Sequence, residues 1–162
     1  MDFPICSLCV ESESLCEKCR KKLADGSITE SDASISRVVK KVYEKARATD
    51  GADIKKIIET NSFVLIACTE PEKMIGNDMV VKQISKEMGK PVKIIGDSAD
   101  VRGVVQMLIE PTVLIGIDIL YTESGEKLRA RIPLGSGMAF HEADVKAAVS
   151  GLFRKEIVFA RE

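Results

Sequence analysis

The stretch DIKKIIETNSFVLIACTEPEKMIGNDMVVKQISKEMGKPVKIIG, residues 53–96, decides the fold of this 162-residue chain. It begins with two short runs rich in β-branched residues, residues 53–60 and 63–69, which are separated by the polar pair Asn61 and Ser62. Two such runs joined by a short polar turn predict a β-hairpin.

Two helices and a third strand are predicted after this hairpin. Pro71 favours a short helix over residues 70–76, because proline is tolerated in the first turn of a helix. Residues 79–89 predict a second helix, with Gly89 as its C-terminal stop. The run KPVKIIG, residues 90–96, predicts the strand that follows.

A further helix is predicted upstream, in TESDASISRVVKKVYEKARA (residues 29–48). Ser31 or Asp32 can cap its start. Apolar residues recur at helical spacing, namely Ile35, Val38, Val39 and Val42. The predicted order is therefore helix, strand, strand, helix, helix, strand.

The last third of the chain repeats most of this order with little sequence identity. A helix stopped by Pro111, a hairpin around the turn ESGE, one helix and a final strand are predicted, over residues 99–109, 112–122, 127–134, 141–153 and 156–160. This repetition indicates a tandem duplication. We expect an α+β protein with domains at residues 1–30, 31–97 and 98–162.

The first domain contains four of the five cysteines, in the pattern C-x2-C-x6-C-x2-C. Two C-x-x-C pairs this close together can supply four thiolates to one tetrahedral ion, which is typical of a structural zinc site. A segment this small and polar also has too little hydrophobic core to fold alone and needs a cross-link such as a bound metal ion. The sequence predicts one structural Zn²⁺ bound by Cys6, Cys9, Cys16 and Cys19.

Two alternatives for the cysteine cluster stay open. An iron–sulfur cluster uses the same four ligands, and a disulfide or redox pair uses two of them. The fifth cysteine, Cys68, lies within an apolar run and is expected to be a small buried core residue.

The composition narrows the class of protein. The chain is 45% hydrophobic and 30% charged, which is typical of a globular protein, and its net charge of −1 is not that of a strongly basic nucleic-acid binder. Met1 is followed by a polar stretch rather than an apolar signal-peptide core, and the apolar runs are too short to span a bilayer. We therefore expect a cytoplasmic protein without a membrane partner.

Residues 31–97 resemble the K-homology (KH) domains of archaeal NusA-like transcription proteins, and the resemblance extends more weakly through the last third of the chain. It rests on IIETNSFVLIACTEPEKMIGNDMVVKQISKEMGKPVKIIG and on the order of elements. The resemblance implies two type II KH-like domains of order αββααβ. The second is degenerate, because Gly135 and Gly137 stand upstream of a single predicted helix.

In KH domains a G-x-x-G loop between two helices approaches nucleic-acid phosphates closely. Here the loop reads Gly76-Asn77-Asp78-Met79, so that the last glycine is replaced and the loop is one residue short of the family pattern. The resemblance implies RNA-binding residues at and beside this loop, namely Gly76, Asn77, Lys73, Lys82 and Lys86. A further candidate basic stripe consists of the alternating Lys127, Arg129 and Arg131.

The sequence contains no pattern typical of an active site. Its one histidine, His141, lacks the second histidine of a zinc-protease motif and is expected to be a helix-cap or surface residue. The resemblance implies a non-catalytic RNA-binding factor of archaeal transcription elongation or termination, or of RNA processing, with single-stranded RNA as its ligand. The alternative is an adaptor that docks on RNA polymerase or on a ribosome-associated protein, with the KH folds as scaffold.

Overall fold

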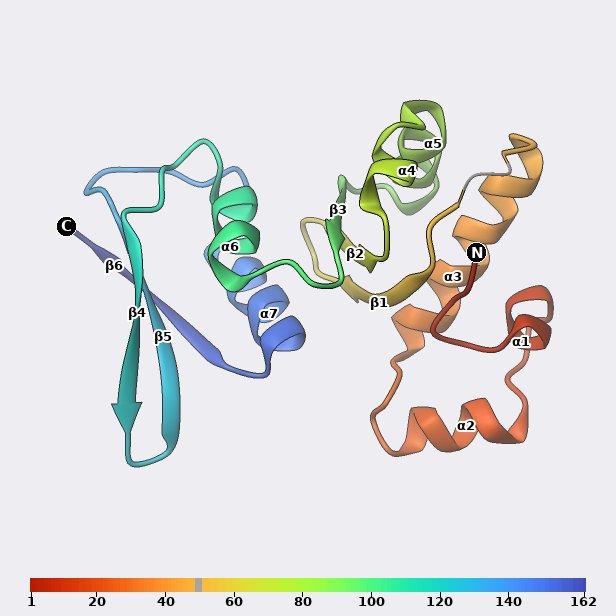
Figure 1. Ribbon diagram of the computed structural model, residues 1–162, viewed down its shortest axis with the longest axis horizontal. Coiled ribbons are helices and arrows are strands. Elements are labelled where there is room, and N and C mark those ends of the chain that lie inside the picture. Colours follow the sequence, from red (N-terminus) through yellow and green to blue (C-terminus); the bar gives the residue numbers. More distant parts are fainter. Residues whose placement is uncertain (49–50) are drawn as a thin grey trace. The chain divides into compact units, whose positions relative to one another are not determined.

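The computed structural model describes residues 1–48 and 51–162, and the chain divides into two compact units (Figure 1). The first unit contains Met1–Glu59 and Val64–Ser98, and the second contains Thr60–Phe63 and Ala99–Glu162. Each unit has one three-stranded sheet, and the described residues form seven helices. The predicted α+β class is confirmed. The cysteine-rich segment belongs to the first unit, and its boundary at residue 30 stays a prediction.

The first unit follows the predicted order of elements from residue 30 onward. Its elements are α1 (Ser7–Glu11), α2 (Glu17–Ala24), α3 (Glu30–Lys45), β1 (Ile54–Glu59), β2 (Val64–Cys68), α4 (Pro71–Ile75), α5 (Asp78–Met88) and β3 (Val92–Gly96). The sheet order is β1-β2-β3, with β1 antiparallel and β3 parallel to the central strand β2. The two helices between β2 and β3 make this parallel return, which a tight turn cannot make.

The hydrophobic core of the first unit lies between its sheet and its helices. Ile35, Val39 and Val42, which recur on one face of α3, are at most 4% exposed and pack against Ile66 of the central strand and Ile84 of α5. The predicted helical spacing therefore marks the buried face of α3 correctly.

The start of α3 differs from the prediction. Its N-cap is Thr29, whose side chain accepts a hydrogen bond from the backbone N–H of Asp32, while the Asp32 carboxylate accepts one from the Thr29 N–H in return. Ser31 and Asp32 lie inside the first turn, because this reciprocal capping box fixes the start three residues before Asp32. The other oxygen of Asp32 accepts the Ile57 N–H at 2.9 Å, so that this buried carboxylate also connects α3 to β1.

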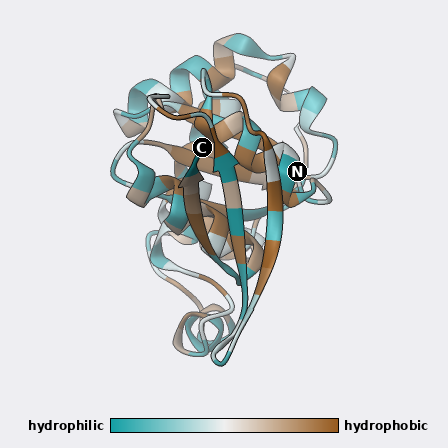
Figure 2. Ribbon diagram, turned by 90° about the vertical axis from the view of Figure 1, so that its left-hand side faces the viewer, coloured by the Kyte–Doolittle hydropathy of each residue, from teal (hydrophilic) through white to brown (hydrophobic). Residues whose placement is uncertain are grey.

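The second unit has the same sheet topology with fewer helices. Its elements are α6 (Val101–Ile109), β4 (Gly116–Thr122), β5 (Gly125–Ile132), α7 (Glu142–Phe153) and β6 (Glu156–Arg161). β4 is antiparallel and β6 parallel to the central β5. Figure 2 shows this sheet with hydrophilic and hydrophobic residues alternating along its strands. One helix, α7, connects β5 to β6, as the sequence predicted.

The predicted strand over residues 112–122 begins four residues later, at Gly116. The side-chain amide of Gln106, in α6, forms hydrogen bonds with the backbone of residues 112–115, which the sequence placed in the strand. It donates to the Thr112 carbonyl at 3.0 Å and accepts the Leu114 N–H at 2.8 Å. The Thr112 hydroxyl donates to the Gly137 carbonyl at 2.6 Å. These hydrogen bonds replace the strand pairing that a β-branched run would otherwise make.

In the described residues, no helix combines the length and the apolar character needed to cross a membrane.

Candidate functional site

The four N-terminal cysteines come together in the first unit. Each C-x-x-C pair opens a short helix: Cys6 is the N-cap of α1, which contains Cys9, and Cys16 is the N-cap of α2, which contains Cys19. The four sulfur atoms all lie within 4.8 Å of one another. The sequence CEKCRKKL, residues 16–23, is typical of a cysteine knuckle that runs into a helix, and α2 has this form, whereas no pattern in the sequence indicates α1.

The geometry of the cluster suits a metal ion. The Cys6 Sγ lies 3.4 Å from the Cys9 Sγ and 3.8 Å from the Cys16 Sγ. A tetrahedral zinc with Zn–S bonds of about 2.3 Å places its sulfurs about 3.8 Å apart. All five cysteines are free thiols in this structure. The four clustered cysteines could therefore bind a metal ion.

Backbone amides prepare two of the thiols to ionise. The Cys19 N–H donates to the Cys16 Sγ at 3.5 Å, and this hydrogen bond is the main reason why the pKa of Cys16 falls to about 6. The backbone amide of Cys9 lowers the pKa of Cys6 in the same way. At Cys9 the Cys16 N–H acts to lower the pKa, but burial and the three other thiols outweigh it and raise the pKa to about 12. Thiolate, the form that binds metals, is thus favoured first at Cys6 and Cys16.

The cysteine segment packs on α3. Cys9 and Cys19 are each 1% exposed and share a small hydrophobic cluster with Ile28 and with Ala33 of α3. In addition, the Arg37 Nε of α3 donates to the Cys9 carbonyl at 3.0 Å. Local spacing in the sequence could not reveal a partner 28 residues away. The cysteine segment and the first sheet therefore both pack against α3.

The fifth cysteine, Cys68, lies apart from this cluster in β2. Its side chain is fully buried in the core of the first unit, as predicted. Burial is the main cause that raises the pKa of this thiol to about 11. Cys68 therefore remains a neutral core thiol and not a fifth ligand.

The loop predicted to bind RNA joins α4 to α5. Asn77 is the N-cap of α5, and its side chain accepts the Val80 N–H at 3.4 Å. Gly76 has a right-handed backbone conformation, which does not by itself require glycine. A Cβ at this position would lie 2.9 Å from the Glu72 carbonyl oxygen, and this close approach explains the glycine. Met79, in place of the last glycine, is 73% exposed.

The three predicted RNA-binding lysines lie on these two helices in different electrostatic settings. Lys73 of α4 pairs with Glu70 at 2.9 Å. Lys82 of α5 pairs with Asp78 at 2.7 Å, and the hydrogen bond to Asp78 raises the pKa of Lys82. Lys86 is exposed and has no ion pair within residues 1–48 and 51–162. Exposed ion pairs of this kind are weak, so an incoming phosphate can compete for the two paired lysines.

The second candidate basic stripe is neutralised. Lys127, Arg129 and Arg131 do share one face of β5, opposite the buried Leu128, Ala130 and Ile132. Acidic side chains on the flanking strands pair with each of them: Lys127 with Glu156 at 3.0 Å, and Arg129 and Arg131 with Asp118 at 2.9 and 3.2 Å. The Arg129 hydrogen bond, with Arg131 beside it, lowers the pKa of Asp118. This face is therefore an ion-pair network of both signs rather than a cationic surface.

The single histidine is an exposed residue at a helix start. His141 is the N-cap of α7 and makes no side-chain cap hydrogen bond. Of the two expected roles, helix cap or surface residue, the structure has the surface residue, which stands at the N-cap position without capping through its side chain.

Comparison with known proteins supports the fold and no more. No protein-family model and no curated protein matches the chain. The fold is similar to 59 solved chains. One is the crystal structure of APE1850, with a TM-score of 0.56 and 16% sequence identity over 78% of this chain and 96% of that chain. At this identity the likeness concerns the fold alone.

Proposed function

We propose that this protein is a non-catalytic RNA-binding factor made of a structural zinc module and two type II KH-like domains, the second degenerate. The observation that carries the proposal is the first unit's order of α3, β1, β2, α4, α5 and β3, with a short loop between α4 and α5 and lysines beside it. This is the arrangement in which KH domains hold about four unpaired nucleotides. The resemblance to NusA-like proteins supports a role in archaeal transcription or RNA processing as part of this proposal.

In this proposal the loop at residues 76–79 approaches the RNA backbone and the lysines neutralise its phosphates. Gly76 keeps the loop thin, and Lys86 is available without breaking an ion pair. Asp78 opposes a phosphate at the same place, because it is exposed and adds negative charge at the start of α5. We therefore expect modest affinity that depends strongly on salt.

The zinc module has a structural role in this proposal. When bound, the ion cross-links α1 and α2 through four thiolates and leaves no coordination position open. Cys6, Cys9, Cys16 and Cys19 would hold it, and α3 supports them through Ala33 and Arg37. The same four ligands also suit an iron–sulfur cluster, which metal analysis would distinguish.

Replacing Lys82 and Lys86 with alanine tests the RNA interface. Each phosphate contact on a single strand contributes about 0.7 to the slope of log K against log salt, so the double variant should flatten the slope by about 1.4 and weaken binding at least about tenfold at low salt. Fluorescence anisotropy of the metal-loaded chain with single-stranded RNA, across a salt series, measures both quantities.

Lys21→Ala is the matched control for this experiment. Lys21 pairs with Glu17 at 3.3 Å, with the same i,i+4 spacing as Lys82 and Asp78, but it lies in the zinc module. Its replacement should leave both affinity and slope unchanged. If the wild-type chain binds no RNA at low salt, the RNA-binding proposal fails.

A second candidate function is that of a protein adaptor. The observation that favours it is the pair Ile75, just before the loop, and Met79, its last residue, which are 58% and 73% exposed. Large apolar side chains at a loop tip suit a protein surface better than a phosphate backbone. In this case the KH-like units are scaffolds, and RNA polymerase or a ribosome-associated protein is the partner.

A further inference from the structure

The second unit has an apolar groove of about 570 Å³ at one end of its sheet. The groove lies at the end of α7 opposite to the loop at residues 133–141, because Phe153, the last residue of that helix, lines it. Its apolar walls come from the start of α6, the end of α7 and the first two strands: Val101, Ile117, Ile119, Leu128 and Phe153.

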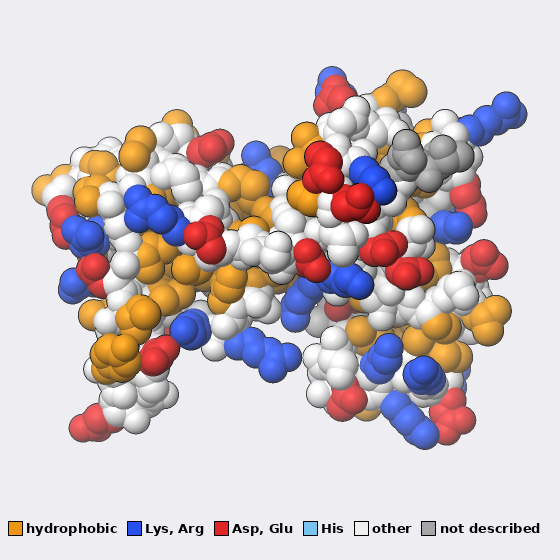
Figure 3. All heavy atoms as spheres, viewed as in Figure 1, with side chains coloured by type: hydrophobic (Ala, Val, Ile, Leu, Met, Phe, Trp, Pro, Cys, Tyr) orange, Lys and Arg blue, Asp and Glu red, His pale blue; other side chains and the backbone are white. Residues whose placement is uncertain are grey.

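The groove lies on the sheet face that packs against the helices, at a part of that face that is exposed to solvent. Ile119 pairs across the strands with the buried Leu128, so both side chains lie on the face that the helices cover. Exposure along this face of β4 rises to 49% at Ile119 and to 79% at Tyr121. Figure 3 shows hydrophobic side chains gathered between the β4–β5 hairpin and the helices of this unit. An apolar strip that helices leave partly open is typical of an interaction site.

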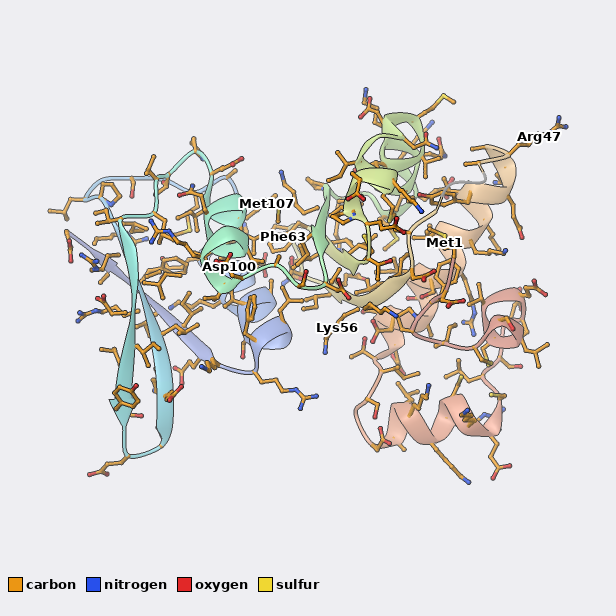
Figure 4. All side chains as sticks on the ribbon, in the orientation of Figure 1. Met1, Arg47, Lys56, Phe63, Asp100 and Met107 are labelled. Carbon is orange, nitrogen blue, oxygen red and sulfur yellow. The ribbon has the colours of Figure 1, made fainter. Side chains whose placement is uncertain are left out.

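Cationic side chains stand beside the apolar walls. Arg102 and Lys155 both line the groove. Arg102 is exposed in the first turn of α6, which contains no acidic residue, and no carboxylate pairs with it in the described parts of the chain. The positive end of the helix dipole disfavours a cation at this position, so the helix itself gives no reason for Arg102. Asp100, which Figure 4 labels at the start of this helix, caps the Gly103 N–H at 3.0 Å.

The end of α7 supplies the second cationic side. Lys155 pairs with Glu126 at 3.0 Å, and both side chains are about two-fifths exposed. Arg154, between the two lining residues Phe153 and Lys155, is exposed and has a left-handed backbone with a φ of 54°. The groove therefore combines a mainly aliphatic floor with an exposed Arg102, which has no ion pair in the described residues, and a surface ion pair between Lys155 and Glu126 at its edges.

We propose that this groove docks a segment of a partner protein that inserts aliphatic side chains between β4 and α7 and places carboxylates against Arg102 and Lys155. The floor is mainly aliphatic, with Phe153 as its one aromatic ring, whereas single-stranded nucleic acids use several aromatic platforms. The carboxylates of Asp100 and Glu126 near the edge also repel a polyphosphate chain more than a segment with one or two acidic residues. This docking site is independent of RNA binding by the loop of the first unit.

The test is a methyl NMR titration of the full metal-loaded chain with two synthetic amphipathic peptides. The peptides share the same leucine positions and carry either glutamate or lysine at the polar positions. The glutamate peptide should shift the methyl resonances of Ile117, Ile119 and Leu128, and the lysine peptide should not. Ile119→Glu and Arg102→Glu should each weaken the glutamate peptide at least about tenfold.

Two control variants and a third probe complete the test. Leu134→Glu changes an apolar side chain that is 73% exposed outside the groove, and Lys41→Glu reverses an exposed charge in the first unit. Neither should change binding of the glutamate peptide. The proposal is overturned by the absence of groove shifts with that peptide, by equal shifts with the lysine peptide, or by groove shifts with single-stranded oligouridine alone. A failure of the Lys82 and Lys86 experiment would leave it intact.

Discussion

Chains with Cys16→Ser and Cys19→Ser are expected to lose their metal ion and, with it, the fixed structure of α1 and α2. Two of the four ligand sulfurs disappear, and the remaining apolar cluster of this segment is too small to order it. Structural zinc contributes about 10–16 kcal/mol to the folding of zinc-finger peptides. Amide exchange in residues 7–24 should therefore rise by orders of magnitude, and metal analysis should fall from one ion per chain to none.

The fifth cysteine provides the control for this experiment. Cys68→Ala removes a thiol in β2, far from the cluster in sequence and fully buried, so one ion per chain should remain. Zinc without visible colour would support a structural zinc site, and iron with sulfide would support the cluster alternative. The metal proposal is wrong if the double serine variant keeps wild-type exchange protection in α1 and α2.

Asp32→Ala is expected to destabilise the first unit by about 2–4 kcal/mol, since it removes one of the two hydrogen bonds of the capping box and leaves the buried Ile57 N–H unsatisfied. The carboxylate accepts the Thr29 N–H at 2.8 Å and the Ile57 N–H at 2.9 Å, and its residue is 3% exposed. Alanine fills neither role. The measurement is the free energy of opening at the Ile57 amide, from native-state hydrogen exchange of the metal-loaded chain.

Two further variants separate the roles of the two oxygens of Asp32. Asp32→Asn keeps an acceptor for the Ile57 N–H but turns an NH₂ group toward the Thr29 N–H, so its cost should lie between those of wild type and alanine. Asp78→Ala, at an exposed aspartate whose ion pair with Lys82 is on the surface, should cost less than about 1 kcal/mol. A cost for Asp32→Ala no larger than that of Asp78→Ala would show that the bridge to β1 is unimportant.

Features that depend on neighbouring residues could be predicted from the sequence. The hairpin at Asn61 and Ser62, the glycine stop at Gly89 and the cysteine spacing are local signals, and the structure has each of them. The start of α3 was misplaced, because Thr29 competes with two other capping residues within four positions and the partner at Asp32 decides between them.

Features that depend on distant residues were not predictable. Gln106 binds the backbone on both sides of Val113 and so keeps a β-branched run out of the sheet. Arg37 reaches Cys9, and Asp118 neutralises two arginines of the neighbouring strand. The docking groove collects side chains from several elements, and no window of sequence contains them together. The RNA ligand and the partner remain proposals for the same reason, since each depends on surfaces and not on the fold.

The two units differ in the number of helices that connect the second strand of the sheet to the third. Both units return a parallel third strand beside the central one, the first through α4 and α5 and the second through α7 alone. One helix is therefore sufficient to connect the central strand to its parallel neighbour in such a sheet. The additional helix α4 in the first unit is thus not required by this topology, and what it adds to the unit is the loop between α4 and α5.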